Sequence, residues 1–412
     1  MKKQKLFLCL SSLSIITLPL ISSSCIKKEE QDLLLSTRNN VNIVIKPEAK
    51  TKNENSLVEN DFIASNYDNN IFEIRYSLIK NSTPAILRIF IKEKQTNREV
   101  SKDFELVIKD GNIQIQNKEI SNPKPDQKPQ PPVAPNKDLV YEKTNKYYLA
   151  LENLSGMQLL NKLHEIQIEG TRGIKSNSTG YEYLKTTYRD AFIDKYYEND
   201  GTILDLYSEN PNGKDPYTYA HYGGYSANQE GQGTNREHII PQSWFNKLDP
   251  MRNDAHHVWP SDIYVNEKHG NYPYGTVKTS TFTSLNGTKV GDSFEDGNPV
   301  CEPIDAFKGD VARAILYFSF TYKDQNLRNN QSAKRFYIDD TNKINPAFLK
   351  TLLKWHHDDP IDQFDIDRNN AIAKHQTVRN PFIDYPELVD VIFNNKTDYT
   401  FHNKGTLKAI NK

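Results

Sequence analysis

Hydrophobic and polar residues alternate along several stretches in the first third of the chain, a period that is typical of β-strands. The segment Asp110-Gly111-Asn112 lies between two such stretches and predicts a hairpin turn. We therefore expect a small all-β module over residues 41–120. It contains no His or Cys and no cluster of acidic residues, so we expect no chemistry from it. The alternating apolar residues are Val41, Ile43, Ile45, Phe72, Ile74, Tyr76, Leu78, Phe104, Leu106, Ile108, Ile113 and Ile115.

A proline-rich segment separates this module from the rest of the chain. Residues 121–136 read SNPKPDQKPQPPVAPN and contain six prolines. Such a segment cannot bury apolar area and prefers the extended polyproline geometry of a semi-rigid spacer. We therefore expect a linker over 121–137 that lets the two modules move apart, and a separate domain over 138–412.

Beyond the linker, apolar residues recur mainly at helical spacing. The stretch from 200 to 275 is instead rich in Gly, Asn and Tyr, and it predicts loops around short strands. The fold class is therefore multidomain, with a small all-β module followed by a mainly helical α+β domain. The expected helices run from Ser155 to about Gly170, from Asp310 through Phe318, from Asn345-Pro346 through Trp355, and from Pro386 to about Phe393.

The amino terminus has the order of a secretory signal peptide, with basic residues, an apolar run over 6–21 and three serines before Cys25. Small residues followed by a cysteine resemble the lipobox of bacterial lipoproteins, although Ser22 stands where a leucine is usual. We expect a signal peptide over 1–24, a lipid on Cys25 and a tether over 25–40. The protein would then be held on the cell membrane and face the exterior; an uncleaved anchor and plain secretion are the alternatives.

Composition and charge limit how the protein can bind nucleic acid and whether it can form disulfide bonds. The chain has 412 residues, a net charge of -1 and a mean hydropathy of -0.73. This charge excludes a global basic field, so binding to phosphate groups must come from a local patch or from a metal ion. Cys9 lies in the expected signal peptide and Cys25 would carry the lipid. Only Cys301 then remains, so no intrachain disulfide is expected.

The strongest candidate for chemistry is the pair Glu237-His238. Four of the ten histidines fall between 238 and 269. A histidine beside a carboxylate, with more polar ligands a short loop later, is what metal-assisted attack on a phosphodiester requires. The pair ends an expected short strand, so its side chains point to opposite faces unless a bend brings both to one site. If the pair stood alone, a surface ion pair and a core histidine would be the favoured explanation.

Other polar residues are ambiguous when each is taken singly. The pairs His256-His257 and His356-His357 lack the spacing of zinc ligands, and the motif His-Glu-x-x-His is absent. A zinc metallohydrolase is therefore disfavoured, and structural roles are expected for these histidines. Asn266 fits either a turn residue or an amide ligand of a hard cation beside a carboxylate.

Two arginines stand in apolar surroundings. Arg313 lies on an apolar expected helix, and Arg379-Asn380 lies in a segment that mixes polar and apolar residues. A buried guanidinium needs a partner, which favours structural ion pairs. The planar fork of arginine also suits phosphate, so both residues remain candidates for substrate binding.

Taken together, these motifs resemble the endonuclease I family of His-Me finger, or ββα-metal, nucleases. The resemblance spans roughly 138–395 and leaves the first third of the chain uncovered. Several motifs in the same order are far more specific than the Glu-His pair alone. The motifs are Glu237-His238-Ile-Ile-Pro-Gln-Ser, Asp254-Ala-His-His-Val-Trp-Pro-Ser, Val265-Asn266, Gly270-Asn271-Tyr-Pro-Tyr-Gly275, Gly309-Asp310-Val-Ala-Arg313, Leu353-Lys-Trp355-His356, Arg368-Asn369 and Gln376-Thr-Val-Arg379-Asn380-Pro.

The resemblance implies a ββα-metal finger with Glu237 and His238 on its hairpin and Asn266 on its helix. His238 is then the general base, and Glu237 and Asn266 are ligands of Mg²⁺, with Mn²⁺ or Ca²⁺ as alternative cations. His269 departs from the family pattern, because relatives often have an arginine there.

The resemblance does not identify the arginine that stabilises the leaving phosphate. Arg252 and Arg313 are both candidates for this catalytic role. His257, Arg379 and Asn380 are further candidates, either for substrate binding or for structural roles.

The function implied is a membrane-anchored, extracellular, metal-dependent endonuclease. It would hydrolyse the phosphodiester bonds of DNA, and RNA as a second substrate, with little sequence specificity. The alternative is a non-catalytic surface lipoprotein that binds nucleic acid or a host or partner protein on a nuclease-derived fold. The presence of Glu237, His238 and Asn266 together favours the enzyme. No residue of the β module indicates a protein partner for it.

Overall fold

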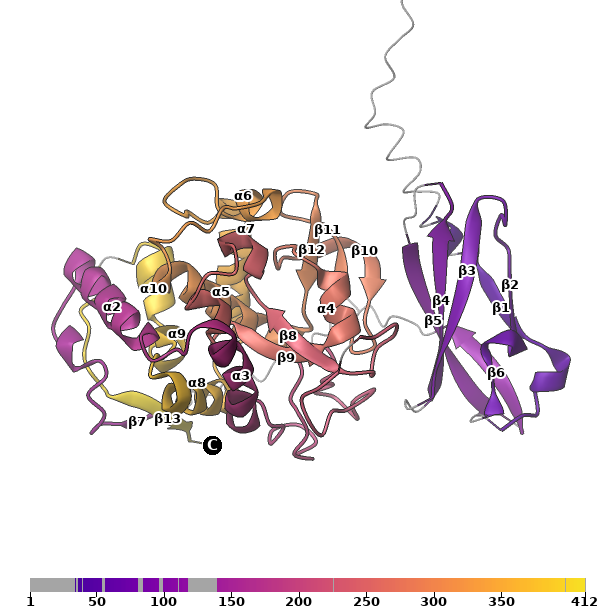
Figure 1. Cartoon of the computed structure of the whole chain (residues 1–412), viewed down its shortest axis with the longest axis horizontal. Coiled ribbons are helices and arrows are strands. Elements are labelled where there is room, and N and C mark those ends of the chain that lie inside the picture. Colours follow the sequence, from indigo (N-terminus) through magenta and orange to yellow (C-terminus); the bar gives the residue numbers. More distant parts are fainter. Residues whose placement is uncertain are drawn as a thin grey trace, which may run out of the picture.

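The computed structural model describes residues 34, 36–38, 40–53, 56–80, 84–95, 99–109, 111–117, 139–224, 226–396 and 398–411. The expected signal peptide, Cys25, most of the tether and the expected linker lie outside these residues. The described residues form an N-terminal region of small antiparallel sheets and a larger α+β region (Figure 1). None of the helices in this part of the chain is long and apolar enough to cross a membrane.

The strands of the N-terminal region are β1 (Asn42–Ile45), β2 (Phe62–Ser65), β3 (Phe72–Ile79), β4 (Ala85–Glu93), β5 (Glu99–Lys109) and β6 (Asn112–Asn117). Strands β1 and β2 pair with each other, and β3 to β6 form an antiparallel sheet in sequence order. Gly111 lies between β5 and β6 with a φ of 73°, as the hairpin motif predicts. Both sheets contribute to one apolar core, so the alternating pattern correctly predicts a small all-β unit.

Strand β4 departs from the alternation that its neighbours show. All of its residues from Ala85 to Glu93 are buried except Lys92. One face of the strand, which includes Leu87 and Ile89, packs into the core of the N-terminal region. The opposite face packs against the larger region, so this strand is covered on both sides.

The interface between the two regions combines apolar contacts with a buried ion pair. The guanidinium of Arg88 binds the carboxylate of Asp103 at 2.7 Å within the N-terminal region, and it also binds Glu230 of the larger region. Against the effect of burial, these two carboxylates hold the pKa of Arg88 well above its ordinary value. The apolar residues that pack together here are Ile79, Ile86, Ile203, Tyr217, Tyr219 and Leu285.

This interface corrects the expectation that the two modules move apart freely. The side chains of Arg88 and Glu230 are 1% and 0% exposed. Separation of the regions would break their ion pair and expose the apolar cluster around Tyr217 to water. The described residues therefore form one docked arrangement.

Replacing Arg88 by Ala should destabilise the full chain by about 3–5 kcal/mol, because the carboxylate of Glu230 would stay buried without its partner. Urea unfolding measures this change, with the exposed Lys109→Ala on β5 as the control. An Arg88→Ala protein whose free energy of unfolding stays within about 0.5 kcal/mol of the wild-type value would contradict the buried interface.

The helices of the larger region are α2 (Gly156–Thr171), α3 (Asn177–Ala191), α4 (Ile263–His269), α5 (Lys308–Thr321), α6 (Gln331–Phe336), α7 (Pro346–Asp358), α8 (Gln363–Gln376), α9 (Pro381–Asp384) and α10 (Leu388–Phe393). Helix α5 is buried over 309–321, as its apolar sequence predicts, and α7 packs along it. The side chain of Asn345 caps α7 by accepting a hydrogen bond from the backbone of Ala347. The helix expected from Pro386 begins two residues later, at Leu388.

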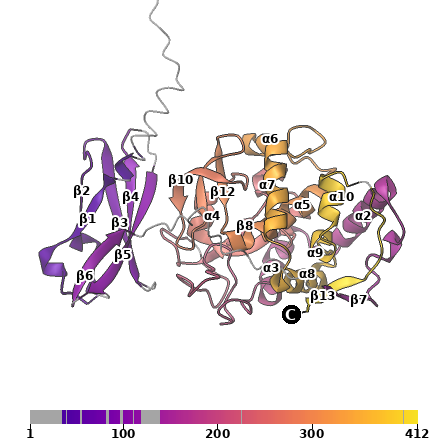
Figure 2. The ribbon, with the colours of Figure 1, turned by 180° about the vertical axis from the view of Figure 1, so that it is seen from behind.

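The strands of the larger region are β7 (Leu139–Glu142), β8 (Thr234–His238), β9 (Val258–Asp262), β10 (Val277–Thr283), β11 (Lys289–Ser293), β12 (Pro299–Glu302) and β13 (Thr406–Ile410). They form antiparallel sheets in the orders β8-β9, β10-β11-β12 and β13-β7. In Figures 1 and 2, β10 to β12 lie at the end that faces the N-terminal sheets, and most helices gather toward the other end. The pair β8-β9 lies between these two parts, and α4 lies beside β12 in both views (Figures 1 and 2).

Candidate active site

Glu237, His238 and Asn266 lie on one compact finger made of β8, β9 and α4. The two strands pair antiparallel, with Glu237 opposite Trp259 and His238 opposite Val258. Helix α4 follows β9 directly and carries Asn266. The element order is therefore the ββα order that the resemblance implies.

The carboxylate of Glu237 is buried and held by two neighbours. The hydroxyl of Tyr207 donates to its Oε2 at 3.0 Å, and Nδ1 of His269 lies 3.2 Å from its Oε1. The hydroxyls of Tyr207 and Tyr274 are hydrogen-bonded to each other at 2.9 Å, and Nε2 of His269 lies 2.8 Å from the carbonyl oxygen of Tyr272. His269 donates to both Glu237 and the carbonyl of Tyr272 when each of its ring nitrogens carries a proton. Glu237 is only 2% exposed, so these contacts take the place of water and hold the carboxylate in one orientation.

His238 faces different partners from Glu237, as expected for adjacent strand residues. Its Nε2 donates to the carbonyl oxygen of Arg252 at 3.2 Å, and its ring stacks on Tyr181 with an interplanar angle of 17°. Because a carbonyl only accepts, Nε2 carries the proton and Nδ1 keeps its lone pair. Burial lowers the pKa of His238 to about 4, so the ring is neutral near neutral pH and can accept a proton.

The oxygen atoms on this finger suit a hard divalent cation. Nδ2 of Asn266 donates to Oγ of Ser261 at 3.3 Å, which leaves the amide oxygen Oδ1 available as a ligand. The carboxylate of Glu237 has lone pairs beyond those used by Tyr207 and His269. Proteins bind Mg²⁺ through one or two such oxygens, while waters and phosphate fill the remaining positions. Glu237 and Asn266 therefore fit a magnesium ion, and the same donors accept Mn²⁺ or Ca²⁺.

Sequence reasoning missed the tyrosines that surround the pair. Tyr207 comes from the long loop before β8, and Tyr181 comes from α3. Nothing in their sequence surroundings distinguishes them from the other tyrosines of the chain. Tyr274 lies inside a motif that carries the resemblance, and His269 departs from the family pattern, so the sequence does give a signal for these two residues.

Arg252 contributes more than its carbonyl to the surroundings of His238. Its guanidinium lies over the ring of Tyr181, with Cζ 4.2 Å from the ring centroid, and no described residue accepts a hydrogen bond from it. Arg236 lies over the same ring at 3.9 Å and bonds Glu182 at 3.2 Å. Two guanidinium groups thus stack on the tyrosine that also stacks on His238, which is an arrangement suited to phosphate.

Arg313 is placed elsewhere, and its candidate catalytic role is corrected. The residue is 0% exposed, and its guanidinium donates to Asp365 at 2.5 Å and to the carbonyl of Asp359 at 2.7 Å. A fully buried guanidinium that is bonded to protein acceptors cannot contact a substrate phosphate. Arg313 therefore holds α5 to the segment that begins α8.

The remaining candidates also have structural partners. Arg379 donates to the carboxylate of Asp384 at 2.7 and 2.8 Å, and Asn380 caps α9 while its Nδ2 donates to the carbonyl of Arg313 at 3.1 Å. Nε2 of His257 donates to the carbonyl of Met251 at 2.6 Å, and burial holds the pKa of His257 well below its ordinary value. These contacts favour structural roles for Arg379, Asn380 and His257.

One histidine of each pair outside the Glu-His motif, His256 and His356, is buried. Nε2 of His256 donates to the carbonyl of Val378 at 3.1 Å, and burial lowers the pKa of His256 to about 3. Burial likewise lowers the pKa of His356 to about 3. Both rings are neutral and lie inside the fold, which favours structural roles for them.

Comparison with known proteins gives the family. The family model described as Endonuclease I matches residues 156–387, a segment that contains the whole finger. The chain is 30% identical over 260 residues to a protein of Bacillus subtilis (strain 168) named extracellular ribonuclease, a match that covers 61% of this chain and 80% of that protein. A protein of the same name from Bacillus amyloliquefaciens is 30% identical over 257 residues, covering 61% of this chain and 78% of the relative. The chain therefore belongs to the Endonuclease I family, and it is a phosphodiester-cleaving nuclease.

Proposed function

We propose that the chain is a metal-dependent endonuclease that hydrolyses phosphodiester bonds of DNA and RNA with little sequence preference. The observation that carries this proposal is the state of His238. The ring is neutral, its Nε2 is held by the carbonyl of Arg252, and its Nδ1 is left to accept a proton. A base in this state beside a buried carboxylate suits the attack of water on a phosphodiester.

In this proposal, Nδ1 of His238 takes a proton from water while the water oxygen attacks phosphorus and the 3′-oxygen leaves. The carbonyl of Arg252 continues to accept from Nε2 and so stabilises the imidazolium that forms. Stacking on Tyr181 restricts rotation of the ring and keeps Nδ1 directed to one place.

Glu237 and Asn266 would hold the magnesium ion on the same finger. When bound, this cation stabilises the negative charge that develops on the phosphate and on the leaving oxygen. Tyr207 and His269 keep the carboxylate of Glu237 oriented, so little reorganisation is needed when the ligand set assembles.

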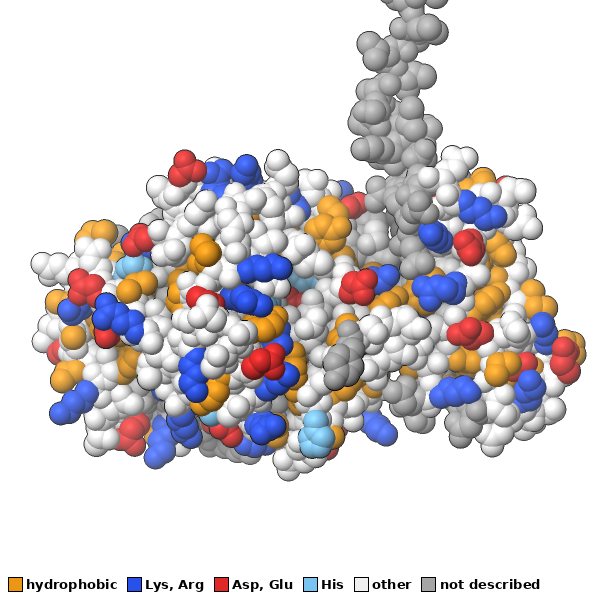
Figure 3. All heavy atoms as spheres, viewed as in Figure 1, with side chains coloured by type: hydrophobic (Ala, Val, Ile, Leu, Met, Phe, Trp, Pro, Cys, Tyr) orange, Lys and Arg blue, Asp and Glu red, His pale blue; other side chains and the backbone are white. Residues whose placement is uncertain are grey.

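Arg252 is the arginine that we assign to the phosphate, since no described residue accepts a hydrogen bond from its guanidinium. Lys and Arg side chains gather over the part of the larger region that carries β8, β9 and α3, which supports binding of a polyanion there (Figure 3). Contacts to backbone phosphates carry no base information, and this is the reason to expect little sequence specificity. The name of both similar proteins, extracellular ribonuclease, supports RNA as a substrate beside DNA.

We extend the proposal to the location and organisation of the chain. The similar proteins are extracellular by name, and the first 24 residues have the order of a signal peptide. A lipid on Cys25, a tether over 25–40 and a linker over 121–137 would hold the catalytic domain, residues 138–412, outside the cell membrane.

His238→Ala should reduce the rate of RNA and plasmid cleavage by at least ~10²–10⁴, because the general base is removed while the fold is retained. Initial rates at saturating Mg²⁺ measure the loss, and the exposed His402→Ala serves as the matched control. A His238→Ala protein that cleaves within about tenfold of the wild-type rate would rule out His238 as the base.

Glu237→Gln and Asn266→Ala should each raise the Mg²⁺ concentration needed for half-maximal cleavage, because each weakens or removes an oxygen ligand. Titration of Mg²⁺ into chelator-treated protein measures this shift, with the exposed Glu165→Gln on α2 as the control. Undiminished cleavage in excess chelator would exclude the metal mechanism. Binding of nucleic acid without cleavage in any divalent cation would favour a non-catalytic binding protein.

Cys25→Ser should release the protein from the membrane or leave its signal peptide uncut, because stable attachment requires the two acyl chains of a diacylglyceryl group. The intact mass of the mature wild-type protein should begin at a lipid-modified Cys25. A mature chain that retains Met1, or that has an unmodified residue 25, would contradict the anchor.

A further inference from the structure

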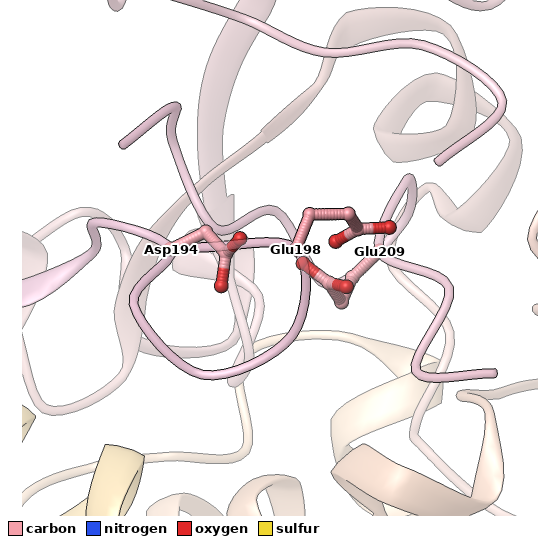
Figure 4. Close-up of side chains that lie close together, drawn as sticks. All are labelled: Asp194, Glu198 and Glu209. Atoms are coloured by element: carbon pink, nitrogen blue, oxygen red, sulfur yellow. The ribbon is translucent and has the colours of Figure 1, made fainter. Parts of the chain in front are cut away.

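The loop between α3 and β8 is long and has no α-helix or β-strand in its described residues, 192–224 and 226–233. It nevertheless carries four carboxylates that lie close together, those of Asp194, Glu198, Glu209 and Asp215. Figure 4 shows the first three directed toward one another from separate turns of the loop. This cluster is distinct from the finger that carries Glu237.

The geometry of the cluster matches the ligand shell of one cation. One carboxylate oxygen from each of Asp194, Glu198 and Glu209 lies within 4.8 Å of the others. Oxygens that share one Ca²⁺ each lie about 2.3–2.6 Å from it, so any two are at most roughly 5 Å apart. The three side chains therefore reach a common ion without rearrangement of the loop.

Among the described residues, the oxygens that the buried members direct into the cluster meet no positively charged group, and no hydrogen-bond donor other than a neighbouring carboxyl group. Glu209 is 1% exposed, and neither of its carboxylate oxygens receives a hydrogen bond from a described residue. Asp194 is 2% exposed; its Oδ1 accepts from two backbone amides, whereas its Oδ2 is buried without a donor. Buried carboxylate oxygens are normally paired or bound to a metal, because their desolvation is costly.

The carboxyl groups of the cluster raise one another's pKa values, because they are buried and close together. Burial and the neighbouring carboxylates of Asp215, Glu198 and Asp194 raise the pKa of Glu209 to about 10. Burial and like-charge repulsion also raise the pKa of Asp215 to about 7, although the backbone of Asn210 opposes the change. No Lys or Arg of the described residues forms an ion pair with any of the four.

We infer that Asp194, Glu198 and Glu209 bind one calcium ion. Calcium is favoured over magnesium because the donors are all carboxylates on an irregular loop. Ca²⁺ accepts six to eight oxygens in flexible geometry, whereas Mg²⁺ demands a near-ideal octahedron and usually keeps several waters. Asp215 lies beside the ion and contributes negative charge; its Oδ1 is already bonded to the amide of Asn210 at 2.7 Å.

The ion would stabilise the turn that presents Tyr207 to the finger. The amide of Glu209 donates to the carbonyl of Asp205 at 3.0 Å, and Nδ2 of Asn286 donates to the carbonyls of Leu206 and Glu209 at 3.0 and 3.2 Å. Tyr207 lies inside this turn and donates to Glu237. Calcium binding therefore orders a segment that positions a residue of the candidate active site.

Isothermal titration of Ca²⁺ into the full chain tests the inference in the Glu237→Gln background, where the proposed magnesium ligand is weakened. We expect one Ca²⁺ per chain, with a dissociation constant on the order of 10⁻⁴–10⁻³ M or tighter, and a rise in Tm on addition of Ca²⁺. Because Glu237 is already altered, the failure of the nuclease assignment would leave this result unchanged.

Glu209→Gln in the same background should weaken Ca²⁺ binding at least about tenfold, and Asp194→Asn should do the same. The surface change Glu165→Gln should leave it unaltered. Glu209→Gln also replaces a carboxyl group whose burial beside other carboxylates is unfavourable, so it should raise the Tm measured without Ca²⁺, which shows that the variant is folded. Absence of Ca²⁺ binding up to millimolar concentrations, or equal binding by Glu209→Gln, would overturn the site.

Discussion

The catalytic region depends on the burial of one carboxylate, that of Glu237. At 2% exposure it requires polar partners from the protein, and it finds them in Tyr207 and His269. These partners come from the loop before β8 and from α4, so the hairpin, helix and loop must assemble together. The backbone of Asp262 strengthens this link, since its amide donates to Asp205 in the same loop at 2.9 Å. The finger is thus held together by contacts between segments that are far apart in sequence.

His238 lies next to Glu237 at the end of β8, but its side chain points to the opposite face of the strand and has different neighbours. His238 has its Nε2 bonded to a backbone carbonyl and its ring stacked on Tyr181, and burial keeps the imidazole neutral. A short strand therefore presents two adjacent side chains in two environments: one buried among hydroxyl and imidazole groups, and one beside stacked guanidinium groups. Adjacent residues with opposed directions give this separation directly.

Local patterns in the sequence predicted the elements that depend on local chemistry. The alternating residues of β3, the apolar helix α5 and the Asn345 cap of α7 lie where they were expected. The motif residues from Glu237 to Asn266 were predicted to share one finger, and they do. Tyr207, Tyr181 and the carboxylates around Glu209 could not be predicted in this way, because only the path of a long irregular loop and of α3 brings them together.

The partners of the buried arginines could not be predicted from the sequence either. Arg88 and Arg313 each lie in an apolar run, and the sequence alone left Arg313 between a structural and a catalytic role. The partners of both come from distant segments: Glu230 for Arg88, and Asp365 for Arg313. Strand β4 reads as a continuous apolar run because both of its faces are covered, and this coverage follows from docking of the two regions.

In our proposal, Glu237 and Asn266 form the cation site of the nuclease. Its most direct test is the anomalous difference map of His238→Ala crystals soaked in Mn²⁺, a variant that retains both ligands. We expect a peak between the carboxylate of Glu237 and the amide oxygen of Asn266. A map with no peak there, or with Mn²⁺ bound only among Asp194, Glu198 and Glu209, would contradict it.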